Sequence, residues 1–212
     1  MLYKQYQNSR NAAWKVLNTH QICKLPVRIS EICKADGITV RSYSQASKLI
    51  DALGLAQSTI NNDGFAIRIR SRDFIFFDDS CTVGRQRFTV AHEYGHFING
   101  DVSSAPTCRN REPSENDDAI ETQANIVASR ILSPACVLWA LDIHSAEKIC
   151  DLCDISLTAA KWRLKRLETL YAREQNFYRT RGKSCFLMHP DERAVYQRFL
   201  LYIEDLKSSG RF

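Results

Sequence analysis

The chain has 212 residues, of which 44% are hydrophobic and 25% are charged. These values are ordinary for a globular protein of one good-sized domain or two small ones, and they argue against wholesale disorder. A continuous apolar run of about eighteen residues, as a membrane span needs, does not occur in the sequence. Residues 1–17 lack the apolar core and the small-residue cleavage site of a signal peptide. We therefore expect a cytoplasmic protein.

The first half of the chain alternates helical and extended patterns. Apolar spacing predicts helices over residues 3–24 and 42–54. Two short stretches rich in Phe and Ile, 65–69 and 74–78, have the composition of strands. The polar residues 70–73 separate them, so a β-hairpin is the natural interpretation.

The second half reads as mainly helical. A helix is predicted over 85–99, with Gly100 closing it, and a polar loop follows over 100–117. Another helix is expected over 118–132, after which Pro134 begins the next one. Further helices are predicted over 145–152, 157–174 and 190–207. The expected fold class is thus α+β and mostly helical, with one small sheet.

The segment His92-Glu93-Tyr94-Gly95-His96 carries the clearest chemistry. Its two histidines lie four residues apart, so on a helix both imidazoles point to the same spot and can bind one metal ion. Zinc is the usual occupant of such a pair, although iron or manganese would tolerate the same ligands. Zinc lowers the pKa of a bound water to about 7, and Glu93 is placed to take its proton. Gly95 removes the side chain between Glu93 and His96, and since a mid-helix glycine costs about 1 kcal/mol relative to alanine, it suggests a close approach at this point.

A catalytic zinc needs a third protein ligand. The zincin pattern with a third histidine fails in this chain, because Asn99 stands in place of its glycine and Val102 in place of its histidine. A glutamate from a downstream helix is the alternative. Glu121 is the preferred candidate, since it lies on a helix face that is otherwise apolar, where an unpaired carboxylate would be costly. Glu112 and Glu115 are competitors by distance, but they lie in the loop, where no periodicity fixes them. Asp117 and Asp118 look more like helix-start residues, which the helix dipole favours.

The eight cysteines are scattered through the chain. In a reducing compartment they are expected to be thiols, and most of them, such as Cys136, look like small buried apolar residues. A second, structural zinc site is an alternative for one set. That set consists of Cys150, Cys153, Cys185 and His189.

Three motifs in order carry a resemblance to a known family. They are the segment RFTVAHEYGH over 87–96, the segment ETQAN over 121–125 and Leu-Ser-Pro over 132–134. Together they resemble the ImmA/IrrE family of metallopeptidases, and the resemblance covers roughly residues 25–170. It implies a zincin-like peptidase core in which His92, His96 and Glu121 bind zinc and Glu93 is the general acid and base. It also implies a protein substrate, commonly a helix-turn-helix repressor of a mobile element or stress regulon.

A basic segment follows the motifs. The local surplus of positive charge over residues 161–183 exceeds the net charge of the whole chain, which is +5. The sequence before it reads as helix, tight turn and helix, with Ser156 capping the second helix. DNA contact would be made by Lys161, Arg163, Lys165 and Arg166. The alternative is a packing or substrate-docking subdomain that buries Trp162, Leu164 and Leu167.

These patterns predict a peptidase core over residues 1–142 and a helix-turn-helix-like subdomain over 143–212. The main hypothesis is a zinc endopeptidase that cleaves a cytoplasmic regulator. The alternative is a DNA- or partner-binding regulator whose metal site is structural or vestigial, and the intact Glu93 argues against it. Candidates for a side chain that stabilises the oxyanion are Tyr94, His144 and His189.

Overall fold

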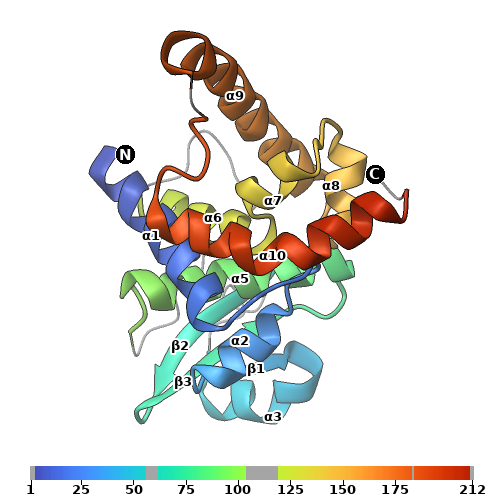
Figure 1. The fold of residues 1–212 in the computed structure, drawn as a ribbon. Coiled ribbons are helices and arrows are strands. Elements are labelled where there is room, and N and C mark those ends of the chain that lie inside the picture. Colours follow the sequence, from blue (N-terminus) through green and yellow to red (C-terminus); the bar gives the residue numbers. More distant parts are fainter. Residues whose placement is uncertain (1–2, 56–61, 104–118, 183, 211–212) are drawn as a thin grey trace. The chain divides into compact units, whose positions relative to one another are not determined.

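The computed structural model describes residues 3–55, 62–103, 119–182 and 184–210 (Figure 1). It confirms a mostly helical α+β fold with a small three-stranded sheet. Within these residues, no helix combines the length and the apolar character that crossing a bilayer demands. The elements are α1 (Tyr3–Thr19), α2 (Ile29–Ala35), β1 (Thr39–Ser42), α3 (Tyr43–Ala52), β2 (Gly64–Ile69), β3 (Arg72–Phe77), α5 (Val83–Asn99), α6 (Ala119–Leu132), α7 (Ala135–Ala140), α8 (Ala146–Cys153), α9 (Leu157–Arg181) and α10 (Pro190–Ser208).

The chain divides into two compact units. The first comprises residues 1–9 and 28–128, and the second comprises residues 10–27 and 129–212. Both α1 and α6 therefore contribute residues to each unit. The division into a peptidase core over 1–142 and a subdomain over 143–212 stays a prediction about how the chain is organised for function.

The sheet belongs to the first unit and has the order β1-β3-β2. β2 and β3 pair antiparallel as the predicted hairpin, with Ala66 opposite Ile75. The connection is shorter than the four residues expected from sequence, because Arg70 and Ser71 both adopt positive φ and close a two-residue turn. β1 pairs parallel with β3 and is a strand that the sequence patterns did not predict.

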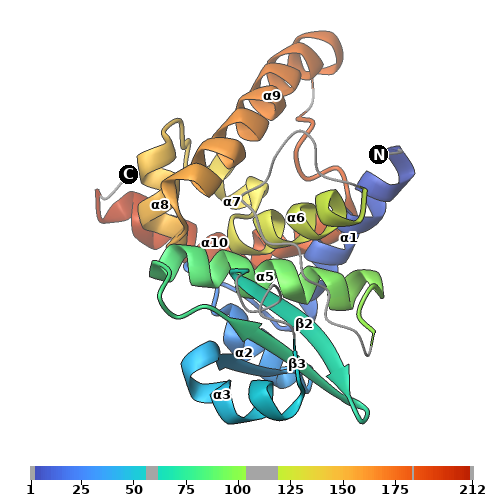
Figure 2. The same cartoon turned by 180° about the vertical axis from the view of Figure 1, so that it is seen from behind.

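The two faces of the sheet are covered by different helices. Phe65, Ile67 and Phe76 form an apolar core with Ala46 and Ile50 of α3. Successive side chains of a strand point to opposite faces, so Gly64 and Ala66 lie on the other face. α5 packs there, and Figure 2 shows it running along the sheet.

Gly64 allows α5 to lie close to the sheet. A Cβ atom at this position would lie 2.5 Å from the methyl group of Thr89 on α5 and 2.5 Å from the carbonyl oxygen of Phe76. Real Cβ contacts are longer than this, so any larger residue would force the helix and the strand apart. The packing of α5 against β2 fixes the helix that carries the two histidines.

Helix α2, between residues 29 and 35, was not predicted either. It is short, and it contacts α5 and β1. The expected helix over 42–54 is confirmed as α3, which begins with a capping box in which the Ser42 hydroxyl accepts from the Gln45 N–H. β1 ends at this capping residue, so strand and helix follow each other directly.

The second unit is helical. α8 packs against α9, and α7 contacts both α9 and α10. The Ser156 hydroxyl accepts from the backbone N–H of Ala159, as predicted for the cap of α9. α9 is longer than expected: it continues to Arg181 and ends at Gly182, which adopts a left-handed conformation. Two arginines in its last turn favour this extension, because they complement the negative end of the helix dipole.

Among the described residues of the second unit, three charged side chains are buried. They are Arg130 of α6, Arg163 of α9 and Glu192 of α10. Burial raises the pKa of Glu192, and the nearby charges of Arg130, Arg10 and Arg163 oppose that rise, with a net pKa above the ordinary value. Glu192 thus supplies negative charge next to two buried guanidinium groups.

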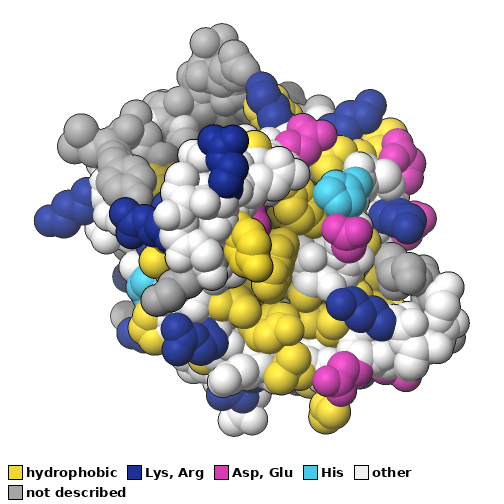
Figure 3. All heavy atoms as spheres, turned by 45° about the horizontal axis from the view of Figure 1, so that its top comes forward, with side chains coloured by type: hydrophobic (Ala, Val, Ile, Leu, Met, Phe, Trp, Pro, Cys, Tyr) yellow, Lys and Arg dark blue, Asp and Glu magenta, His cyan; other side chains and the backbone are white. Residues whose placement is uncertain are grey.

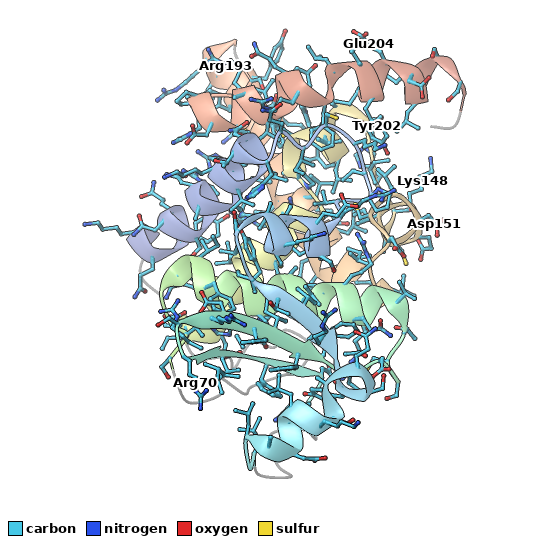
Figure 4. All side chains as sticks on the ribbon, turned by 90° about the horizontal axis from the view of Figure 1, so that it is seen from below. Arg70, Lys148, Asp151, Arg193, Tyr202 and Glu204 are labelled. Carbon is cyan, nitrogen blue, oxygen red and sulfur yellow. The ribbon has the colours of Figure 1, made fainter. Side chains whose placement is uncertain are left out.

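We expect the Glu192→Gln variant to be less stable than the wild type by about 1–3 kcal/mol, because buried charges that lose a partner pay their desolvation cost. Chemical denaturation of both proteins measures this difference. Glu204→Gln is the matched control, since Glu204 lies on the same helix and points away from it into solvent (Figure 4). An equal loss in both variants would show that the buried charge at position 192 has no special role.

Candidate metal centre

His92 and His96 project from the same face of α5. The Nε2 atoms of their rings are 3.1 Å apart, and both side chains are buried. The rings meet edge to face, with centroids 4.8 Å apart. The four-residue spacing therefore does what the sequence predicts and brings two imidazole nitrogens to one point.

Glu121, in the first turn of α6, reaches the same point. Its carboxylate lies 3.2 Å from His92 Nε2 and 3.6 Å from His96 Nε2. The face of α6 is apolar as expected at Ala124 and Val127, which are fully buried, but Ile120 is largely exposed. Glu112, Glu115, Asp117 and Asp118 lie outside the described residues.

A close crossing of two helices places this carboxylate. A Cβ atom on Gly95 would lie 2.9 Å from the backbone oxygen of Ala124 and 3.0 Å from its Cα atom. Glu121 and Ala124 are three residues apart on α6, so they share one side of that helix. Because Gly95 has no side chain, α6 can approach α5 closely enough for Glu121 to reach the histidines.

The outer ring nitrogens of both histidines have partners. His92 Nδ1 lies 2.8 Å from Asn125 Oδ1, and His96 Nδ1 lies 3.4 Å from Asp101 Oδ2. An amide oxygen only accepts hydrogen bonds, so His92 donates from Nδ1 and its Nε2 carries a lone pair. Asp101 was not among the sequence candidates; the signal that marks it is its position directly after the glycine that ends α5.

The donor set fits a metal ion. One oxygen of Glu121 and one nitrogen of each histidine lie within 4.8 Å of one another. With Nδ1 protonated, a lone pair on His92 Nε2 faces a carboxylate oxygen, and these two electron-rich atoms repel unless a cation, either a proton or a metal ion, lies between them. Two imidazoles and one carboxylate are the ligands of a zinc site that keeps an open position.

Glu93 is a second buried carboxylate next to the histidine pair. It lies next to His92 on α5 and is fully buried. Burial by itself would lower the pKa of His92, but the hydrogen bond to Glu121 and the charges of Glu93 and Glu121 outweigh it, so the pKa is raised. The pocket of negative charge therefore stabilises a positive charge at the histidine pair.

Tyr94, a candidate for stabilising an oxyanion, is engaged elsewhere. Its hydroxyl donates to Asp36 Oδ2 at the end of α2, and burial together with this bond raises the pKa of Tyr94. On the helix it lies two residues from both histidines, and hence on the opposite face. The structure thus makes Tyr94 an anchor of α5 rather than a group at the metal face.

The other two oxyanion candidates have local contacts in the second unit. His144 bonds to Asp142 and stacks on Tyr171. The ring nitrogen of His189 accepts from the Asp191 N–H and caps α10. A catalytic role for either histidine stays a prediction.

The alternative of a second zinc site receives no support. Within the described ranges, His92, His96 and Glu121 are the only group of three or more His, Cys, Asp or Glu residues whose ligand atoms converge. Cys150 instead donates to the carbonyl of Ile155, and Cys153 is buried and takes part in no disulfide. Cys136 is also buried and free, which confirms that it packs as an apolar residue.

The basic segment is only partly available for contact with a partner. Arg163 is buried and donates to the carbonyl of Ser133, so its predicted contact with DNA is wrong. Lys161 and Lys165 are exposed, and Arg166 is half-buried. Lys183 lies outside the described residues.

The packing interpretation of the same segment is also only partly right. Leu167 is buried and Leu164 is half-buried, but 37% of Trp162 is exposed and the ammonium group of Lys165 lies over its ring. Basic and hydrophobic side chains also lie side by side on the face drawn in Figure 3, where Lys and Arg are dark blue and hydrophobic residues are yellow.

Comparison with known proteins agrees with this geometry. A family model described as the IrrE N-terminal-like domain, Peptidase_M78, matches residues 33–165. A search of curated proteins finds no match. The matched range contains α5, α6 and all three candidate ligands.

The crossing at Gly95 yields a prediction with a definite sign. Replacing a mid-helix glycine by alanine ordinarily stabilises a helix by about 1 kcal/mol, whereas overpacking costs about 1–3 kcal/mol. Since the new Cβ would meet backbone atoms, we expect Gly95→Ala to lower both stability and zinc affinity. Thermal denaturation and zinc titration against a chelating dye measure the two effects. A more stable variant with unchanged zinc affinity would contradict the close crossing.

Proposed function

Because the chain belongs to the ImmA/IrrE family of peptidases, we propose that it is a zinc-dependent endopeptidase that cleaves a cytoplasmic regulatory protein. The observation that carries this proposal is the convergence of His92, His96 and Glu121 beside a buried glutamate on the same helix. This is the ligand set of a catalytic zinc site, which leaves one position open for substrate or water.

A zinc ion held by these three residues would supply a Lewis acid that polarises a peptide carbonyl and makes water more acidic. The chain's own residues perform the remaining work. Glu93 takes a proton from the attacking water, whose oxygen bonds to the peptide carbonyl carbon, and delivers this proton to the amide nitrogen as the C–N bond breaks. Asn125 holds the His92 ring by its Nδ1–H, so that the Nε2 lone pair stays directed at the metal position.

The substrate class rests on family membership. We propose a helix-turn-helix repressor of a mobile element or stress regulon as the regulatory protein that is cleaved. The buried site also requires a segment of the substrate to be extended where it is cut, because a folded helix would not bring its backbone to a buried carboxylate. The identity of the regulator stays a prediction.

The alternative function is a DNA- or partner-binding regulator with a structural or vestigial metal site. Exposed Lys161 and Lys165 on α9 favour contact with an acidic partner. Two features argue against it as the main function. Structural zinc sites close all four positions with protein ligands, and within the described residues three ligands converge. A fully buried Glu93 beside them has no purpose in a purely structural site.

The Glu93→Gln variant separates the two functions. We expect it to bind zinc like the wild type but to cleave its target about 100-fold more slowly or worse, since general acid–base catalysis is typically worth that much. The substrate to use is a purified helix-turn-helix repressor, taken from the neighbouring gene where that gene encodes one, incubated with zinc-loaded enzyme. Glu168→Gln, an exposed glutamate on α9, is the control and should cleave normally.

Full biological activity of Glu93→Gln would exclude proteolysis as the function and favour the binding alternative. Zinc affinity measured on the same preparation shows that the change acts on chemistry and not on the metal site. Removal of zinc with a chelator should abolish cleavage by the wild type, and added zinc should restore it.

A further inference from the structure

We infer that Asp101 is a positioning residue of the metal centre: its carboxylate fixes the tautomer and orientation of His96, so that Nε2 faces the metal. The inference rests on the zinc site of the proposed function but not on peptidase activity. None of the sequence motifs described above includes Asp101, and its role follows from how α5 ends.

The end of α5 brings the backbone of Asp101 back to His96. Gly100 adopts the left-handed conformation, with φ of 80°, which a glycine reaches without strain. Its N–H bonds to the carbonyl of Phe97 at 3.1 Å, and the N–H of Asp101 bonds to the carbonyl of His96 at 2.9 Å. This pair of bonds is the Schellman ending of a helix. The turn therefore places residue 101 next to a metal ligand.

The side chain of Asp101 makes a second contact with the same histidine. Its Oδ2 atom lies 3.4 Å from His96 Nδ1. The side chain of His96 is 2% exposed and that of Asp101 is 23% exposed, so the carboxylate lies between a buried ring and solvent. An ionised carboxylate only accepts hydrogen bonds, so His96 donates from Nδ1 and keeps the lone pair of Nε2 for the metal.

A third bond anchors the segment that carries Asp101. The backbone N–H of Arg68 on β2 donates to the carbonyl of Ser103 at 2.9 Å. The segment is thereby tied to α5 at residue 101 and to the sheet at residue 103. Such double attachment restricts the carboxylate to a small range of positions, and a positioning group needs that restriction.

The two histidines are held by partners of different chemistry. His92 donates to the neutral amide of Asn125, whereas His96 faces a carboxylate. A carboxylate partner makes the imidazole a stronger base and hence a stronger metal ligand, and loss of such an outer partner typically weakens metal binding about 10–100-fold. Asp101 Oδ2 is the hydrogen-bond partner at His96 Nδ1, so its carboxylate acts on the orientation of this ring.

The test measures zinc affinity by competition with a chelating dye for the wild type, Asp101→Ala, Asp101→Asn and Asp51→Ala. We expect Asp101→Ala to bind zinc about 10–100-fold more weakly. Asp101→Asn should lose less, since its amide oxygen can accept from His96 as Asn125 does from His92. Asp51→Ala is the charge control, because Asp51 is an exposed acid of α3 in the same unit, and it should bind like the wild type.

Two further readouts separate positioning from a structural role. The melting temperature of the zinc-free protein should be unchanged in Asp101→Asn, because its backbone bonds are intact. The visible absorption of the cobalt(II)-loaded protein should change in Asp101→Ala, because that spectrum reports the geometry of the ligands. A purely structural role would lower the melting temperature and leave the cobalt spectrum of the folded protein unaltered.

An unchanged zinc affinity in Asp101→Ala, or an equal loss in Asp101→Ala and Asp51→Ala, would overturn the inference. If the alanine variant does not fold, Asp101→Leu decides, because leucine is of similar size and offers no hydrogen-bond acceptor: a zinc affinity equal to that of the wild type overturns the inference, and a measurable loss supports it. A wild-type protein that does not bind zinc would overturn both this inference and the proposed function. Zinc binding by the wild type with no effect at position 101 would overturn this inference alone.

Discussion

The close crossing of α5 and α6 at Gly95 and Ala124 is the constraint on which the metal centre depends. Two histidines on one helix make only part of a site, and the third donor has to come from another element. That donor, Glu121, lies one turn before Ala124, so the distance between the helices at the crossing sets its reach. A mid-helix glycine makes a helix less stable by about 1 kcal/mol relative to alanine. At position 95 this loss accompanies the close approach of α6, which a larger side chain would prevent.

The rest of the first unit holds α5 in place from several sides. Thr89 packs against Gly64 of the sheet, and the Tyr94 hydroxyl bonds to Asp36 of α2. At its end, Gly100 turns the chain so that Asp101 returns to His96. On this helix Thr89 and His96 lie on the same face two turns apart, so the sheet contact and the metal position are neighbours, whereas Tyr94 lies on the opposite face. Precise placement of ligands needs this rigidity, because small displacements are costly in metal binding.

The buried charges around the two histidines are also those expected of a metal site. Glu93 and Glu121 are both buried beside two imidazoles, a combination that a core built only for stability would avoid. Burial opposes a charge on His92, but the hydrogen bond to Glu121 and the charges of Glu93 and Glu121 outweigh it and raise the pKa of His92, so the pocket favours a cation at that point. Buried carboxylates are compensated differently in the second unit, where Glu192 lies near the guanidinium groups of Arg130 and Arg163. In that unit buried groups of opposite charge lie near one another, whereas at the histidine pair two imidazole nitrogens and a carboxylate oxygen converge on a single point.

The sequence by itself determined the features that depend on near neighbours. Helical spacing predicted that His92 and His96 meet, an apolar helix face selected Glu121, and Gly95 indicated a close approach that Ala124 now explains. Tertiary structure decided the features that join distant segments. It showed that Tyr94 faces Asp36, that Arg163 is buried against Ser133, and that Asp101 folds back on His96. The physical reason is that periodicity tells which side of its own helix a residue occupies, but the partner on that side is set by how the elements pack.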